Sequence, residues 1–157
     1  MSADDLSFTK DYYQRLEKGI EELPAEERER LYRPCAARCV KDTVLKEQQR
    51  QFQECKGDLD LQYTRYGNSE YFFANIIEKG RVYEIGYPKC LCRLAASGFV
   101  HSPVHCECSR QSILYILHNL LPDKEIRVEI IETVLGGGSR CRFRVVIESS
   151  EGSAVSR

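Results

Sequence analysis

Two closely spaced cysteine pairs constrain the fold of this chain more than any other feature of its sequence. Cys90 and Cys92 form the first pair, Cys106 and Cys108 form the second, and thirteen residues separate the two pairs. In extended backbone both sulfurs of a Cys-x-Cys pair point to one side, because successive side chains alternate between two faces. A loop that folds back between the pairs can therefore bring all of their sulfurs to one point.

Several cysteine sulfurs that meet at one point can coordinate a metal ion. Zinc accepts four thiolates in a tetrahedron, and an iron–sulfur cluster is also held by four cysteines. The sequence therefore predicts zinc, with an iron–sulfur cluster as the alternative, on these ligands: Cys90, Cys92, Cys106 and Cys108. His101 and His105 lie in the same segment, and either imidazole could replace one of the thiolates.

The second cysteine pair also permits a catalytic interpretation. Cys106 and Cys108 directly precede a predicted helix, and the positive end of a helix dipole lowers the pKa of a thiol. Cys108 with His105 nearby would then be the nucleophile and base of a thiol-dependent hydrolase that acts on a small molecule. From the residues alone, metal binding, nucleophilic catalysis and simple packing of the thiols all stay open.

Charge and hydropathy exclude several classes of partner. The formal net charge of −1 provides no basic field for nucleic acid. No apolar run approaches the twenty or so residues that span a bilayer, and the acidic, polar residues 1–5 are unlike a signal peptide. We therefore expect a cytoplasmic protein without nucleic-acid or membrane partners, in which the eight cysteines stay reduced. Its oligomeric state is not indicated.

The first part of the chain, residues 1–67, predicts an N-terminal helical region. Apolar residues recur at spacings of three and four over residues 7–23, which is typical of an amphipathic helix. A second, short helix should begin at Pro24 and end before Pro34, where a third begins. Cys35 and Cys39 would share one face of this third helix. That face is expected to be core, with addition of both thiols to the cysteine cluster as the alternative.

Residues 68–149 predict a Cys-rich α/β sandwich region within the same compact domain. Turn residues predict a short helix over 71–80 and a loop over 92–103. Alternation of side chains predicts a strand over 81–87 and a hairpin of 126–131 with 141–147. A strong apolar stripe predicts a helix over 109–121. Cys55 and Cys141 are expected in the core. The tail, residues 150–157, is expected to be disordered. The fold class is α+β, an antiparallel sheet with helices packed on one face.

The closing hairpin carries a further pattern. An acidic residue in the first strand, a glycine turn and a Cys-x-Phe in the last strand fall on Glu129 or Glu132, Gly136 to Gly138, and Cys141 with Phe143. With the preceding strand, cysteine-bearing loop and long helix, this pattern resembles the vinyl-reductase-like small-molecule-binding domains and the 2-aminothiazoline-4-carboxylate hydrolase-like family. The resemblance implies an α/β sandwich with a cavity for a small, rather apolar ligand, and in some members a metal held by cysteines.

These observations together predict a metal-binding, zinc-thiolate domain that binds a small ligand or a regulatory partner. The alternative is an enzyme, either a thiol-dependent hydrolase or an iron–sulfur redox protein. The resemblance carries over no catalytic residue.

Overall fold

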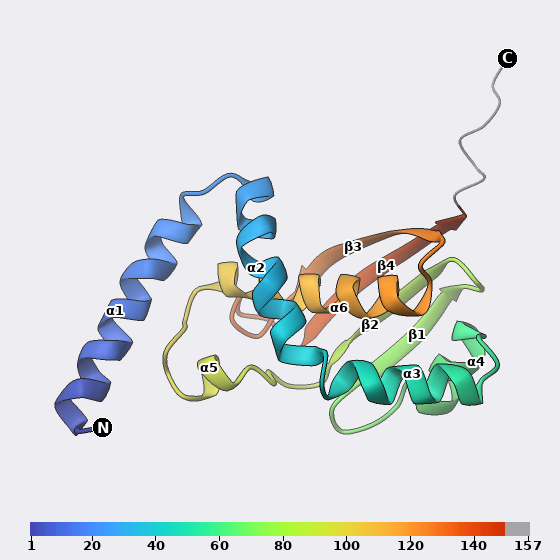
Figure 1. Ribbon diagram of the computed structural model, residues 1–157, viewed down its shortest axis with the longest axis horizontal. Helices are drawn as coiled ribbons and strands as arrows, with labels where there is room; N and C mark the ends of the chain where they lie inside the picture. Colours follow the sequence, from blue (N-terminus) through green and yellow to red (C-terminus); the bar gives the residue numbers. More distant parts are fainter. Residues whose placement is uncertain (150–157) are drawn as a thin grey trace, which may run out of the picture.

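The computed structural model describes residues 1–149, and the predicted disorder of residues 150–157 lies outside that range. Figure 1 shows a single antiparallel sheet with α6 (Glu107–Leu120) lying along it, while the first helix of the chain extends away from the sheet. The predicted α+β class is therefore confirmed. No helix within residues 1–149 has the length and apolar character needed to cross a bilayer.

Four helices make up the N-terminal part: α1 (Ala3–Glu21), α2 (Ala25–Val40), α3 (Val44–Glu54) and α4 (Leu59–Tyr66). The predicted break before Pro34 is wrong, because α2 continues through this proline. Proline removes one hydrogen bond from the helix ladder, but Tyr32 and Ala36 on either side of it are buried, and α2 packs against α6. Tertiary packing thus outweighs the local cost, and the break comes only after Val40.

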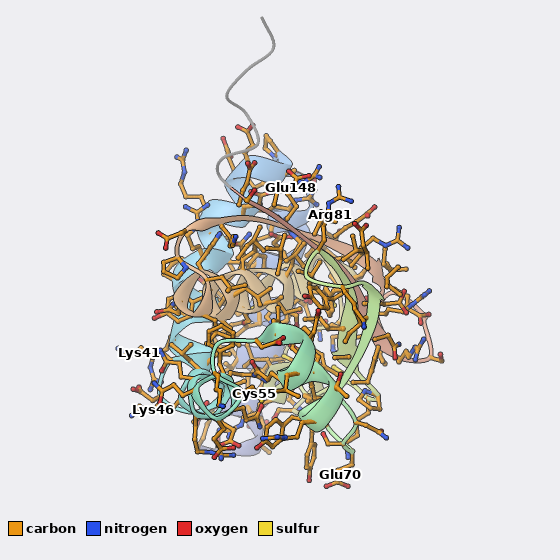
Figure 2. The ribbon with its side chains drawn as sticks, turned by 90° about the vertical axis from the view of Figure 1, so that its right-hand side faces the viewer. Lys41, Lys46, Cys55, Glu70, Arg81 and Glu148 are labelled. Atoms are coloured by element: carbon orange, nitrogen blue, oxygen red, sulfur yellow. The ribbon has the colours of Figure 1, made fainter. Side chains whose placement is uncertain are left out.

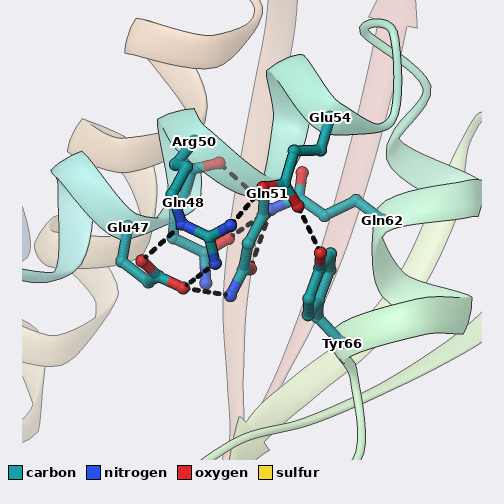
Figure 3. A network of polar contacts seen from close by, with 7 residues as sticks. All are labelled: Glu47, Gln48, Arg50, Gln51, Glu54, Gln62 and Tyr66. Atoms are coloured by element: carbon teal, nitrogen blue, oxygen red, sulfur yellow. Dashed lines mark hydrogen bonds and ion pairs between the residues drawn. The ribbon is translucent and has the colours of Figure 1, made fainter.

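A polar network joins α3 to α4 (Figure 3). Gln62 is fully buried, and its Nε2 donates to Gln48 Oε1 at 2.7 Å. The Tyr66 hydroxyl donates to Glu54, which also pairs with Arg50 one turn earlier. These bonds tie the two short helices together beside the sheet.

The sheet has the strand order β1-β2-β4-β3 and is antiparallel throughout. Its strands are β1 (Phe73–Glu78), β2 (Val82–Tyr87), β3 (Lys124–Glu132) and β4 (Cys141–Ser149). The strand predicted at 81–87 and the closing hairpin are confirmed. The helix predicted over 71–80 is wrong, because this segment pairs with β2 as β1. Ser69 Oγ accepts from the backbone N–H of Tyr71 and Phe72, so it caps a turn and not a helix.

Between β2 and α6 the chain forms a long connection with two short turns of helix. These are α5 (Arg93–Ala96) and the 3₁₀ turn η1 (Pro103–Cys106). α6 itself begins at Glu107, two residues before the predicted start. Cys106 and Cys108 therefore have helical backbone, with consequences for where their sulfurs point.

The core lies between α6 and the sheet. Leu117 of α6 and Tyr83, Phe143 and Val145 of the sheet are almost completely buried. Cys55 and Cys141 are buried, as predicted, and Figure 2 shows Cys55 inside the molecule with Lys46 and Glu70 at its rim. The core position predicted for Cys35 and Cys39 is wrong. Both are exposed on α2, because α2 covers the protein with its other face.

Candidate thiol-rich site

Seven of the eight cysteines gather from four segments of the chain, while Cys55 lies apart at the end of α3. The four segments are α2, the stretch after β2, the η1–α6 junction and the start of β4 (Figure 1). The thiols concerned lie close enough to affect one another's ionisation: Cys35, Cys39, Cys90, Cys92, Cys106, Cys108 and Cys141. Tertiary structure thus concentrates thiols far beyond the two predicted pairs.

The helical backbone at the η1–α6 junction divides these thiols into two groups. Side chains two residues apart on a helix point about 200° apart. Cys106 has Thr133 and the thiols of Cys90 and Cys141 as neighbours, whereas Cys108 has the α2 thiols of Cys35 and Cys39 as neighbours. The shared direction expected of a Cys-x-Cys pair in extended chain does not hold here.

Cys92 is a neighbour of both groups and makes the closest contact with an imidazole. Its Sγ lies 3.3 Å from His105 Nε2. The His105 ring is only 9% exposed and stands edge-on to Tyr32, with ring centroids 5.6 Å apart. Burial lowers the pKa of His105, although the Glu17 carboxylate opposes this shift. The imidazole is therefore held in its neutral form beside a thiol.

The two histidines of the segment have different surroundings. His101 is exposed, and its backbone N–H donates to Glu17. His105 is the one that reaches the thiols. Its partner is Cys92 and not Cys108, which the catalytic hypothesis had assigned to it.

Burial decides the ionisation of the second pair. Burial raises the pKa of Cys108 to about 12 and that of Cys106 to about 11, since a thiolate loses its hydration there. The lowering expected from the helix dipole is thus outweighed. Without a metal ion both thiols stay protonated at neutral pH, which disfavours Cys108 as a nucleophile.

A buried carboxylate positions the segment that carries His105. Glu17 of α1 is 5% exposed. Its oxygens accept from the backbone N–H of His101 at 2.9 and 3.0 Å and from that of Ser102 at 3.0 Å. Ser102 Oγ in turn accepts from the Val104 N–H at the start of η1. Sequence analysis missed Glu17, because a glutamate in an amphipathic helix is normally assigned to the solvated face.

A surface groove of about 630 Å³ lies beside η1, between the α1–α2 junction, α6 and β3. Charged side chains such as Glu21, Arg28, Glu29 and Arg110 alternate on its walls with apolar ones such as Val104, Val128 and Ile130. Arg110 pairs with Glu29 and with Glu107, each at 2.6 Å. This open groove of mixed charged and apolar character differs from the apolar cavity that the family resemblance implies.

Over residues 1–149, no three His, Cys, Asp or Glu side chains stand in an arrangement that could hold a metal ion. The donors nevertheless have the right chemistry, since thiols and a neutral imidazole are the usual zinc ligands. No family model, curated protein or solved structure matches this chain. The resemblance to vinyl-reductase-like domains and to the hydrolase-like family therefore stays a prediction.

Proposed function

We propose that this chain is a zinc-binding domain that uses its thiol-rich region to bind the ion and its surface to bind a small ligand or regulatory partner. The ligands come from the two Cys-x-Cys pairs, Cys90, Cys92, Cys106 and Cys108, with His105 as a fifth available donor. The observation that carries the proposal is the 3.3 Å contact between Cys92 Sγ and His105 Nε2. In a tetrahedral zinc site a sulfur and a nitrogen ligand are about 3.6 Å apart.

Metal binding requires the remaining thiols to move toward this contact. Cys90 and Cys92 lie in irregular chain between β2 and α5, outside any helix or strand. Cys106 and Cys108 are constrained by η1 and α6. Because the sulfurs of Cys106 and Cys108 point apart, we infer that the η1–α6 junction must rearrange as well as the first pair, and that the ion would fasten the 93–105 segment to the start of α6.

Zinc would also change the protonation of these groups. Because burial keeps the pKa of Cys106 and Cys108 high, each thiol that becomes a ligand releases a proton. Zinc affinity should consequently rise with pH over the neutral range.

Elemental analysis of protein purified without added metal tests the proposal. We expect one zinc per chain in the natural protein and in Cys35→Ser, whose cysteine is exposed on α2. Cys92→Ser should lose the ion and melt at a lower temperature, because structural zinc contributes folding free energy. Full zinc content in both Cys92→Ser and His105→Ala would refute the assignment, and visible absorption with bound iron would favour an iron–sulfur cluster instead.

The same contact supports a second candidate function, a thiol-dependent enzyme with Cys92 as nucleophile and His105 as base. A neutral imidazole within 3.3 Å of a sulfur has the position that a general base requires. In metal-free protein, this function predicts one cysteine that iodoacetamide alkylates fastest. Peptide mapping should identify it as Cys92, and His105→Ala should slow its alkylation while Cys35 reacts unchanged.

The charged groove beside η1 is where we propose that the small ligand or partner binds. Carboxylates and guanidinium groups on its walls favour a polar ligand carrying both donors and acceptors. Ser102 and Val104 of the groove wall belong to the segment that zinc would fasten. Ligand binding and metal content should therefore depend on each other.

A further inference from the structure

We propose that α1 pairs with the α1 of a second copy of this chain, antiparallel and around a twofold axis. The surface concerned is an apolar stripe on the outer side of the helix, made of Phe8, Tyr12 and Leu16. None of these residues takes part in the proposed metal site, so the pairing does not depend on zinc.

The inner side of α1 packs on the connection between β2 and α6. The Tyr13 ring stands edge-on to that of Phe99, with centroids 5.6 Å apart, and Glu17 accepts from the backbone of the same connection. At 3.6 residues per turn, Tyr12 and Glu17 point about 140° apart. The α1 stripe therefore faces away from the body of the protein, and Figure 1 shows α1 extending from it.

The α1 stripe is an apolar surface that stays in water in the single chain. Phe8 is 69% exposed, Tyr12 54% and Leu16 47%, and their spacing of four places them on one face. The rings of Phe8 and Tyr12 lie 6.2 Å apart between centroids, so the patch is continuous. Residues 1–8 are all exposed, and a short helix without packing is marginal in water. A partner on this face would stabilise the helix that carries it.

The exposed area fits a reversible dimer of modest affinity. An aromatic side chain has roughly 200 Å² of surface, so the exposed parts of Phe8 and Tyr12 amount to about 250 Å² on each copy. Pairing would bury most of this area twice, together with Leu16 and the flanking side chains. Transient interfaces bury less than about 1,200 Å² in total. Larger interfaces already include micromolar complexes, so we expect a dissociation constant of about 1 µM or weaker.

The α1 stripe is complementary to itself when two copies run antiparallel. Phe8 and Leu16 stand four residues on either side of Tyr12. A twofold axis at Tyr12 therefore places Phe8 of each copy opposite Leu16 of the other, which is the same contact made twice.

Charge on α1 favours the same arrangement. Asp4 and Asp5 lie in the first turn of the helix, and Lys18 lies in the last. An antiparallel pair brings the acidic end of each copy beside the basic end of the other, whereas a parallel pair would bring like charges together. This self-complementary charge pattern is the reason to assign the stripe to a second copy and not to an unrelated partner.

Sedimentation of the full chain over a concentration series in reducing buffer tests the pairing. The natural protein should change from a species of 18.1 kDa to one of twice that mass as the concentration rises. Tyr12→Glu should stay monomeric, because it sets two like charges opposite each other at the twofold axis. Tyr71→Glu is the matched control, since Tyr71 is 53% exposed just before β1. It should dimerise like the natural protein, and circular dichroism of dilute samples checks that both variants are folded.

Charge reversal gives a second and milder test. Lys18→Glu places a carboxylate near Asp4 of the second copy and should weaken the dimer roughly 3- to 10-fold, because two exposed ion pairs become repulsive. Adding Asp4→Lys to Lys18→Glu restores opposite charges at both ends and should recover the dimer. Failure of this recovery would overturn the antiparallel orientation.

Three results would overturn the pairing itself. One is a natural chain that stays monomeric at all concentrations up to about 1 mM. Another is a dimer that persists in Tyr12→Glu or that Tyr71→Glu disrupts to the same extent. The third is a monomer that cosediments with phosphatidylcholine vesicles and loses this binding in Tyr12→Glu, which would assign the α1 stripe to a membrane surface instead.

Discussion

Replacing the buried carboxylate of Glu17 by an amide should measurably destabilise the domain. Glu17 is 5% exposed, and its carboxylate is the acceptor for the backbone N–H groups of His101 and Ser102 at 2.9 to 3.0 Å. In Glu17→Gln, Oε1 can still accept both bonds, but they lose their charge assistance. A hydrogen bond to a charged group contributes about 1 kcal/mol more than a neutral one. With two N–H donors affected, we expect a loss of about 2 kcal/mol.

Glu17→Ala removes the acceptor altogether. Each buried N–H left without a partner costs about 1–3 kcal/mol, so the expected loss is about 4 kcal/mol. Urea unfolding followed by circular dichroism measures both losses, with Glu22→Gln as the control. Glu22 is exposed at the end of the same helix. A second readout comes from NMR titration of His105, since the Glu17 charge raises its pKa. Both Glu17 variants should lower the pKa of His105.

Unfolding of Glu17→Gln and Glu22→Gln at the same urea concentration would refute a stabilising role for the Glu17 carboxylate. The same His105 pKa in the Glu17→Gln and Glu22→Gln variants would also refute it. Glu17→Gln replaces one carboxylate oxygen by an amide nitrogen of similar size. A loss of stability in this variant therefore cannot come from a cavity.

Four further predictions concern protonation and backbone space. The folded pKa of His105 lies below its ordinary 6.5, so the unfolded chain binds the proton first and the free energy of unfolding should fall as the pH drops below about 6.5. In His105→Gln the free energy of unfolding should depend less on pH in this range. In metal-free protein, the folded pKa of Cys108 is raised from 9.0 to about 12, so the free energy of unfolding should fall as the pH rises through 9. Cys108→Ser should show a smaller fall over the same pH range. Gly86→Ala should disrupt folding, because a Cβ would lie 1.9 Å from the Cys141 carbonyl oxygen. Gly19→Ala, with open space around it, should stabilise α1 by about 0.5–1 kcal/mol in thermal melts.

The most regular patterns predicted their elements well. The apolar stripe of residues 109–121 and the alternation on both sides of Gly136 to Gly138 correspond to α6 and the β3–β4 pair. In these segments, local preference and burial favour the same structure. In the segment that forms β1, local preference and burial do not favour the same structure. Its aromatic residues fit a helix or a strand equally, and pairing with β2 decided the outcome.

The cysteine content and spacing could be read from the chain, but the directions of the sulfurs could not. Starting α6 at Glu107 turned Cys106 and Cys108 away from each other, because two residues of helix rotate a side chain by about 200°. Cys39 lies near Cys108 because α2 packs against α6, and no local pattern encodes this proximity.

Periodic burial is a local property, so sequence alone predicted the α+β class, the long amphipathic helix and the closing hairpin. The identity of each thiol's neighbour is a property of helix packing and segment position. Tertiary structure alone therefore paired His105 with Cys92 and buried Glu17 beneath the connecting segment. Both outcomes depend on contacts between residues far apart in the chain, where propensity and spacing carry no information.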